Sequence, residues 1–369
     1  MNRRFTLALA AFLGLAPAVV NAQIAVDGTL NANELGSGPG LYQLAGQYTG
    51  VHSAANRGLA ALYIGATDST LNIMVVASPE KSDYNAILLY LDAPHASGIP
   101  AGTQLGGGDD NSSQFRSRPT LDMPMDYGYR ITVAPSGNDN VYLSRIDYTG
   151  TPNTDGRYRD TYLGPTNKTG NNLVITDPVS NTVGAHFAYQ TGAADVAANG
   201  STGWEFSIPL STVGGATTGD LFNMMVAYVA DNTEFYTDII PQIPNLSTAL
   251  GLDPDFTARI GAQYTGFRIG SGPTATRKAN AQAPQIQIEG QPVTASSAML
   301  CTIPSGTRQI ISEVYNPLGQ KVATLVNETH PVAGSRRVGL ADVAQLPAGS
   351  YVLNTLIGEN LFTTHLVVE

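Results

Sequence analysis

Two adjoining runs of the chain, Ala60-Ala61-Leu62-Tyr63-Ile64-Gly65-Ala66 and Thr70-Leu71-Asn72-Ile73-Met74-Val75-Val76-Ala77, decide its fold class. Both are short and rich in β-branched and aromatic residues, and only Thr67-Asp68-Ser69 separates them. Such runs, bounded by residues that favour turns, are typical of β-strands. The two runs therefore predict strands of an antiparallel sheet.

The same pattern extends on both sides, over residues 23–272. Clusters of Gly, Asn, Asp and Pro separate the strand candidates, and helical periodicity is scarce, its best candidate being a short turn at 210–213. Many short strands with frequent turn signals predict a large antiparallel β-sandwich. Its further strand candidates are residues 85–92, 127–133, 141–148, 203–209 and 224–230. Residues 94–126 contain a glycine-rich run and several prolines, and predict a long loop.

The last part of the chain predicts a second, smaller unit. Residues 273–290 contain few large apolar side chains and predict an exposed linker. Strand candidates then lie within 307–326, 336–340 and 351–368. The fold expected for the whole chain is all-β: a large antiparallel β-sandwich followed by a small Ig-like β-sandwich. Cys301 is the single cysteine and lies in an apolar run, so we expect a buried strand thiol rather than a nucleophile.

Composition limits the partners. The 369 residues include 29 Asp and Glu against 19 Lys and Arg, which gives a formal net charge of -10. No basic cluster occurs outside the first residues, so nucleic acid is not expected as a partner. Only 13% of residues are charged, while glycine and tyrosine are abundant, a balance common in secreted all-β proteins.

The N-terminus predicts an export signal. Asn2-Arg3-Arg4 supplies positive charge, residues 7–20 form an apolar run, and Asn21-Ala22 precedes Gln23. This order is typical of a secretory signal peptide over residues 1–22. A membrane anchor is the competing interpretation, but Gly14 and Pro17 interrupt the run, which is shorter than the roughly 20 residues that span a bilayer. We expect no transmembrane segment in the mature chain.

Two stretches near the C-terminus carry a resemblance to a known family. Val314-Tyr315-Asn316-Pro317-Leu318-Gly319-Gln320-Lys321-Val322-Ala323 is followed by Leu346-Pro347-Ala348-Gly349-Ser350-Tyr351-Val352-Leu353. This succession of strand, Leu-Gly turn, strand and Pro-Ala-Gly-Ser-Tyr motif resembles the type A C-terminal sorting domain of the type IX secretion system of Bacteroidota, over residues 291–369. The resemblance implies the type IX secretion machinery as a partner, and passage through the periplasm to the outer cell surface or the medium.

Residues 23–272 carry a second resemblance. Ile24-Ala25-Val26-Asp27-Gly28-Thr29-Leu30 and Trp204-Glu205-Phe206-Ser207-Ile208-Pro209-Leu210 resemble the opening and the Ile-Pro-Leu strand of family 9-like carbohydrate-binding (DOMON-like) modules, with Tyr90-Leu91-Asp92 as a central strand. The resemblance implies a β-sandwich that binds a polysaccharide. The family uses exposed tryptophans, whereas Trp204 alternates with Phe206 and Ile208 on one strand face, and we expect it in the core.

Tyrosines must then supply any flat surface for a sugar ring. Tyr127 and Tyr129 share a face of one strand candidate, and Asp155-Gly156-Arg157-Tyr158-Arg159-Asp160-Thr161-Tyr162 combines two tyrosines with charged groups. Arginine can hydrogen-bond hydroxyls while tyrosine stacks, so the candidate ligand residues are Arg157, Tyr158, Arg159, Tyr162, Tyr127 and Tyr129. The alternative is that these are ordinary strand tyrosines beside surface ion pairs.

Acidic loops suggest a possible metal. Asp109, Asp110 and Asn111 follow Gly107-Gly108 and offer the oxygen ligands that Ca²⁺ prefers, although a plain turn explains the run equally well. Gly137-Asn138-Asp139-Asn140 offers similar groups but fits a hairpin turn between two strand candidates.

No catalytic motif stands in the sequence. It lacks a Gly-x-Ser-x-Gly elbow, a His-Glu-x-x-His helix, a phosphate loop and a dinucleotide fingerprint. The function expected is therefore a secreted, non-enzymatic protein that binds extracellular glycans. Two alternatives are a structural surface component, such as an adhesin, matrix or filament subunit that binds copies of itself through sheet contacts, and a glycoside hydrolase whose two carboxylates lie apart in the sequence.

Overall fold

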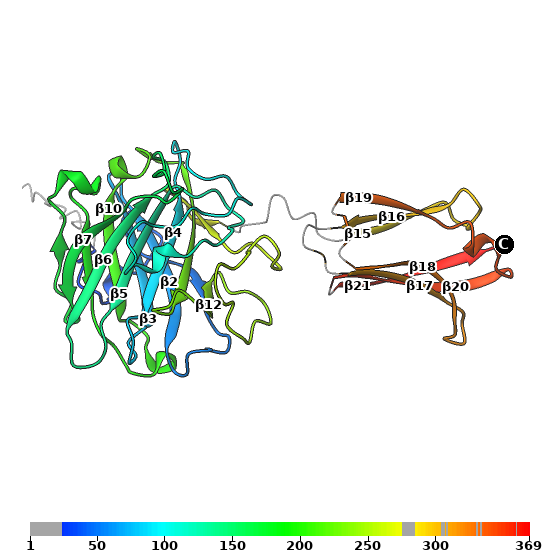
Figure 1. Ribbon diagram of the computed structural model, residues 1–369, viewed down its shortest axis with the longest axis horizontal. Coiled ribbons are helices and arrows are strands. Elements are labelled where there is room, and N and C mark those ends of the chain that lie inside the picture. The colour runs from blue at the N-terminus through cyan, green and yellow to red at the C-terminus, as the bar shows by residue number, and fades with distance from the viewer. Residues whose placement is uncertain are drawn as a thin grey trace, which may run out of the picture.

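The computed structural model of the protein describes residues 24–274, 285–303, 307, 309–329, 331–332, 334–358 and 360–369. Their regular secondary structure consists of antiparallel β-sheets and short 3-10 helices, as the sequence predicts (Figure 1). The expected signal peptide, residues 1–22, and most of the expected linker lie outside the described residues. Within the described part of the chain, no helix has the length and apolar character needed to cross a membrane.

Two large sheets pack face to face in the N-terminal part. The six-stranded sheet has the order β1 (Gln43–Gln47), β2 (Gly58–Ala66), β3 (Thr70–Ser78), β10 (Gly203–Pro209), β9 (His186–Tyr189) and β8 (Leu173–Val174). The eight-stranded sheet has the order β14 (Gly272–Thr274), β13 (Thr265–Arg268), β11 (Leu221–Val229), β4 (Ala86–Asp92), β5 (Tyr127–Val133), β6 (Asn140–Asp147) and β7 (Asp160–Asn167), and β12 (Phe235–Ile240) also pairs with β11. All seven strand candidates of this region are confirmed.

The core between the sheets is built on an aromatic cluster. Trp204 and Phe206 of β10 stack with ring centroids 4.3 Å apart, and Phe206 also contacts Phe187 at 5.5 Å and Tyr129 at 5.8 Å. All four rings are fully buried. We call Trp204, Phe206, Phe187 and Tyr129 the aromatic cluster. The prediction that Trp204, Phe206 and Ile208 point into the core is confirmed.

The other face of β10 carries Glu205, which holds the N-terminal segment against the six-stranded sheet. Its Oε2 accepts hydrogen bonds from the backbone N–H groups of Asp27 and Gly28, both at 2.8 Å, and its Oε1 accepts one from the Tyr42 hydroxyl at 2.9 Å. This cover explains why nearly all of β3 is buried, and why its sequence is a continuous apolar run rather than an alternation. Burial raises the pKa of Glu205 to about 7, although the hydrogen bonds from Asp27, Tyr42 and Gly28 partly oppose this rise.

We predict that Glu205→Gln removes part of the pH dependence of stability. A carboxyl group with pKa about 7 in the folded state and about 4.5 when unfolded binds its proton more tightly in the folded chain. The free energy of unfolding should therefore fall as the pH rises from 4.5 to 7, in total by on the order of 3 kcal/mol. Glutamine keeps an oxygen for the backbone N–H groups but does not titrate.

Urea unfolding at pH 5 and pH 8, followed by the fluorescence of the single tryptophan, Trp204, measures this difference. The free energy of unfolding of wild type should fall more steeply than that of the variant. Equal slopes for the two chains would show that Glu205 keeps its ordinary pKa.

The loop between β4 and β5 covers part of the outer face of the eight-stranded sheet. Residues 94–126 contain only isolated bridges and one 3-10 turn, η2 (Gln114–Arg116), which confirms a loop rather than a strand pair. The loop is nevertheless packed, since Leu105, Phe115 and Met125 are buried against Tyr90 and Ile146 of the sheet. The segment between β5 and β6 is a hairpin turn, in which Asn140 N–H donates to Asn138 Oδ1.

The edge strands β7, β14, β8 and β1 of the two large sheets are short or irregular. Pro165 lies in β7, where the pairing with β6 shifts register between Leu143 and Ser144. At the opposite edge of the same sheet, the three-residue β14 contains Pro273. In the other sheet, β8 has two residues and β1 shifts register before Gly46. A Cβ at Gly46 would lie 2.5 Å from the Ile240 side chain, so this close approach requires glycine.

The C-terminal strands form two further sheets around a separate core. The three-stranded sheet has the order β15 (Gln285–Glu289), β16 (Ala298–Ile303) and β19 (Gly334–Gly339), and the four-stranded sheet has the order β18 (Lys321–Thr329), β17 (Gln309–Tyr315), β20 (Gly349–Ile357) and β21 (Asn360–Val368). Cys301 is buried in β16, as expected. β14 and β15 take up both ends of the expected linker, 273–290, because their backbones pair with β13 and β16.

Candidate functional site

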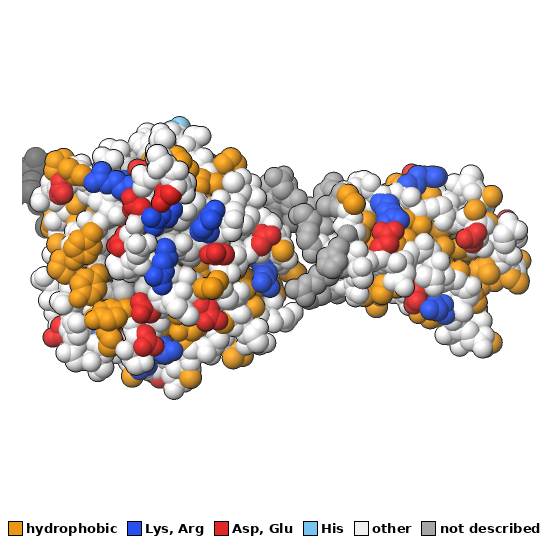
Figure 2. All heavy atoms as spheres, viewed as in Figure 1, with side chains coloured by type: hydrophobic (Ala, Val, Ile, Leu, Met, Phe, Trp, Pro, Cys, Tyr) orange, Lys and Arg blue, Asp and Glu red, His pale blue; other side chains and the backbone are white. Residues whose placement is uncertain are grey.

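The open part of the outer face of the eight-stranded sheet carries a strip of tyrosines. Tyr162 of β7 is 52% exposed, and Tyr142 of β6 lies diagonally from it, because Ser144 is the residue opposite Tyr162. Tyr84, just before β4, is 38% exposed, and its ring centroid lies 6.3 Å from that of Tyr142. We call Tyr84, Tyr142 and Tyr162 the tyrosine strip. Figure 2 shows apolar side chains gathered over β6 and β7 on this face.

The tyrosine strip ends where the 94–126 loop begins to cover the sheet. Tyr158 precedes β7 and packs against Tyr148, with ring centroids 4.8 Å apart. Gly106 of the 94–126 loop lies so close to Tyr158 that a Cβ atom added to this glycine would be 2.9 Å from the Tyr158 ring. The backbone of the loop therefore packs directly on that ring. Tyr158 is therefore a packing residue, whereas Tyr162, beyond the loop, keeps its ring in solvent.

Tyr127 and Tyr129 are not available to a ligand, contrary to the sequence prediction. Tyr129 belongs to the aromatic cluster and is fully buried. Tyr127 is 8% exposed, and the guanidinium carbon of Arg145 lies 4.6 Å from its ring centroid. The two side chains do share one strand face, but that face points into the sandwich, toward the six-stranded sheet.

Arg157 and the 109–111 loop, predicted as separate sites, lie together. The Arg157 guanidinium donates to Asp155 Oδ2 at 2.8 Å and to Asn111 Oδ1 at 3.0 Å. Backbone hydrogen bonds join the same segments, since Asp109 N–H donates to the Tyr158 carbonyl at 2.9 Å. Arg159 is exposed beside β7. These contacts fix the loop to the sheet.

The 109–111 side chains do not fit a calcium site. Asp109 accepts hydrogen bonds from the Asp160 N–H and the Asn153 side chain, and Asp110 accepts two from Ser112. Although burial raises the pKa of Asp110, the bonds from Ser112 hold it below its ordinary value. The oxygens of Asp109, Asp110 and Asn111 thus face different partners. Among the described residues, no three His, Cys, Asp or Glu side chains converge as metal ligands.

A buried polar network lies beside the tyrosine strip on the same face of the sheet, since Ser144 is two residues from Tyr142 on β6 and Asp160 is two residues from Tyr162 on β7. Arg130 of β5 is 4% exposed and donates to Ser144 Oγ at 2.9 Å, Gln114 Oε1 at 3.1 Å and Thr132 Oγ1 at 2.7 Å. The Asp160 carboxylate is buried nearby, beneath Gly108. Burial raises the pKa of Asp160, and the positive charge of Arg130 opposes that rise. The network joins side chains of β5 and β6 to Gln114 of the 94–126 loop.

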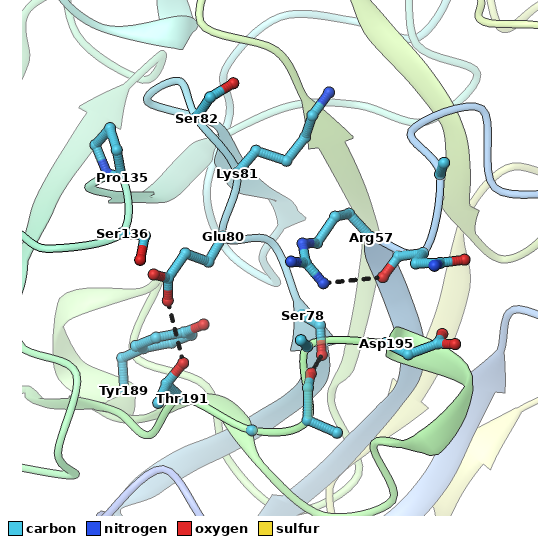
Figure 3. Close-up of a pocket in the computed structure, with 15 residues that line it drawn as sticks. Arg57, Ser78, Glu80, Lys81, Ser82, Pro135, Ser136, Tyr189, Thr191 and Asp195 are labelled. Carbon is cyan, nitrogen blue, oxygen red and sulfur yellow. Dashed lines mark hydrogen bonds between the residues drawn. The ribbon is translucent and has the colours of Figure 1, made fainter.

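A second candidate site is a groove at one end of the sandwich, with a volume of about 890 Å³ (Figure 3). We call it the end groove. Its walls are residues 55–57 before β2, 78–82 after β3, 135–136 after β5 and 189–195 after β9. Arg57 reaches across its middle, and Glu80 points toward Thr191, whose hydroxyl donates to Glu80 Oε2 at 3.3 Å.

Tyr84 and Tyr142 of the strip and all residues of the end groove were not among the residues predicted from the sequence. Tyr142 stood within a strand candidate, and its alternation with Val141 and Leu143 was a usable signal for an outward side chain. For the groove, the charged pair Glu80-Lys81 shortly after a strand candidate was the available signal. Its other walls come from segments with no common motif.

Comparisons with known proteins give no family for this chain. No family model matches it, and no curated protein matches it. Among solved structures, the BSP domain of a biofilm-associated protein is similar over 86% of this chain and 53% of its own, at 10% identity and a TM-score of 0.19. Dimeric latent PorU from Porphyromonas gingivalis is similar over 89% of this chain and 34% of its own, at 11% identity and a TM-score of 0.19. The chain thus spans about half the length of the first structure and about a third of the second. At such TM-scores, neither likeness bears on the fold or function of this chain.

Proposed function

We propose that this chain is a secreted or surface-exposed protein that binds extracellular glycans without catalysing a reaction on them. The observation that carries the proposal is the tyrosine strip. Sugar rings have an apolar face that stacks on aromatic side chains, and their hydroxyls need hydrogen-bonding groups close by. Tyrosine supplies both the ring and a hydroxyl.

The position of the strip supports binding to a polymer. Tyr142 and Tyr162 stand on the paired strands β6 and β7, whose backbones are hydrogen-bonded to each other, so little conformational entropy is lost when they contact a ligand. Tyr84 extends the row toward the start of β4, where its carbonyl accepts a hydrogen bond from Gln114 at 2.9 Å. A row of rings on an open surface suits an extended chain of sugars.

The export part of the proposal rests on the two terminal sequence patterns. Residues 1–22 are proposed as a secretory signal peptide, and residues 291–369 as a type IX sorting domain that delivers the chain through the periplasm to the outside. This location would bring the tyrosine strip into contact with cell-wall and matrix polysaccharides.

We predict that Tyr142→Ala combined with Tyr162→Ala weakens glycan binding by about fivefold or more. Each aromatic contact contributes about 0.5–1.5 kcal/mol, and 1.4 kcal/mol corresponds to a factor of ten. A glycan array and retention on insoluble polysaccharides identify the ligand of the wild type, and a titration with that ligand measures the loss. The fold should persist, because Tyr162 is largely exposed.

Tyr315→Ala, which removes a tyrosine from β17 instead, is the matched control and should bind as wild type does. Full retention of binding by the Tyr142 and Tyr162 variant would exclude the strip as the site. Failure of wild type to bind any glycan would refute the proposed function.

A further inference from the structure

We infer that the end groove is a second binding site, which takes the carboxylate or sulfate group of an acidic saccharide. The saccharide part of this inference rests on the proposed function. The anionic part rests on the charges within the groove, whose lining does not include the tyrosine strip, although Lys81 and Tyr84 belong to the same loop between β3 and β4.

The two acidic side chains of the groove are already engaged. Glu80 Oε1 lies 3.1 Å from Lys168 Nζ, and Glu80 Oε2 accepts the hydrogen bond from Thr191. Asp195 caps the 3-10 turn η4 (Val196–Ala198) by accepting a hydrogen bond from the Ala197 N–H at 3.0 Å. Neither carboxylate pairs with Arg57 or Lys81.

The two basic side chains that line the groove have no carboxylate partner within the described part of the chain. The hydrogen bond of the Arg57 guanidinium is to the Asn56 carbonyl, at a long 3.4 Å. Lys81 Nζ lies 3.4 Å from the Tyr236 hydroxyl and 5.4 Å from the centroid of that ring. Among the described residues that line the groove, Arg57 and Lys81 thus carry charges without an ion pair, and of the two carboxylates only Asp195 also lacks one.

The chemistry of these cations matches an acidic sugar. A guanidinium group binds a carboxylate or sulfate through two parallel hydrogen bonds, and an ammonium group nearby adds attraction. The hydroxyls of Ser82, Ser136 and Thr191 also line the groove and can bond the hydroxyls of a sugar. A volume of about 890 Å³ falls within the roughly 300–1,000 Å³ of ligand sites.

The groove walls are held in place before any ligand arrives. Lys168 is buried and donates to the carbonyls of Ala134 and Pro135, at 2.8 and 3.2 Å, which fixes the 135–136 wall to Glu80. On the opposite side, the Ser78 hydroxyl donates to the Ala193 carbonyl at 2.8 Å. A site with fixed walls loses little entropy on binding.

The test compares polygalacturonate with its fully methyl-esterified form, which has the same backbone without the charge. The variant is Arg57→Gln with Lys81→Gln, and the fluorescence of Trp204 checks that it is folded. The control is Lys321→Ala with Arg337→Ala, which removes the same net charge from exposed positions on β18 and β19.

We expect wild type and control to bind the acid form roughly tenfold more tightly than the ester, with a preference that shrinks as salt is raised. The groove variant should bind both forms equally. A variant that keeps the preference, or a wild type without one, overturns the inference while leaving the proposed function intact. If wild type binds neither polymer and no other glycan, both fail together.

Discussion

Phe206→Ala should lower the free energy of unfolding of the large sandwich by about 3–5 kcal/mol. Phe206 is fully buried at the centre of the aromatic cluster, where it contacts Trp204, Phe187 and Tyr129. Its removal leaves a cavity between two sheets whose hydrogen-bonded backbones cannot close to fill it. Such a loss is a large share of the 5–15 kcal/mol that usually stabilises a domain.

Urea unfolding followed by Trp204 fluorescence measures this loss, because the single tryptophan remains in the variant. Tyr162→Ala is the matched control, since it also removes one ring but from an exposed position, and it should change stability by less than about 1 kcal/mol. A change below about 1 kcal/mol in Phe206→Ala would contradict the packing described for the core.

Arg130→Met should destabilise the same sandwich by about 3–5 kcal/mol at neutral pH. The substitution keeps the length of the side chain but removes the donors to Ser144, Gln114 and Thr132. It also leaves the buried Asp160 carboxylate without the positive charge that opposes the rise of its pKa. An uncompensated buried charge costs more than the pair contributes when intact.

The pH dependence distinguishes this loss of charge from a simple packing defect. Without Arg130, the pKa of Asp160 rises further above its unfolded value, so the folded variant binds a proton that the unfolded chain does not. The difference in stability between wild type and variant should therefore narrow as the pH falls from 7.5 to 5. Arg159→Met, at an exposed position beside β7, is the control and should cost less than about 0.5 kcal/mol. A pH-independent difference would show that the charge of Asp160 plays no part.

The sequence predicted the all-β fold because strand formation depends on local patterns. β5 and β10 begin and end at the predicted residues, since each has one face in the core and clear turn signals at its ends. The edge strand β7 was not predicted, because a strand at the edge of a sheet is less buried and its apolar residues alternate less clearly. Its Pro165 is also a residue that is rare inside strands. β15 was taken as linker for a similar reason, because its alternation is short and follows a polar segment.

The site was harder to predict because it depends on which segments meet. Tyr158 and Tyr162 are equivalent by spacing, and only the path of the 94–126 loop decides that the first is covered and the second open. Tyr127 and Tyr129 share a face, but alternation alone does not tell which face of a sheet is buried. The acidic run at 109–111 has the composition of a metal site, yet its oxygens serve to fix a loop.

The blunted margins of the two large sheets determine how copies of this protein can associate. A neighbouring chain that adds a strand needs a long, regular row of free N–H and C=O groups, and Pro165, Pro273 and the irregularity before Gly46 interrupt such rows on β7, β14 and β1, while β8 has only two residues. Continuous hydrogen-bonded growth of the sandwich into fibres is thereby disfavoured. An array built through the large sandwich would then be held by side chains on its faces rather than by a shared sheet.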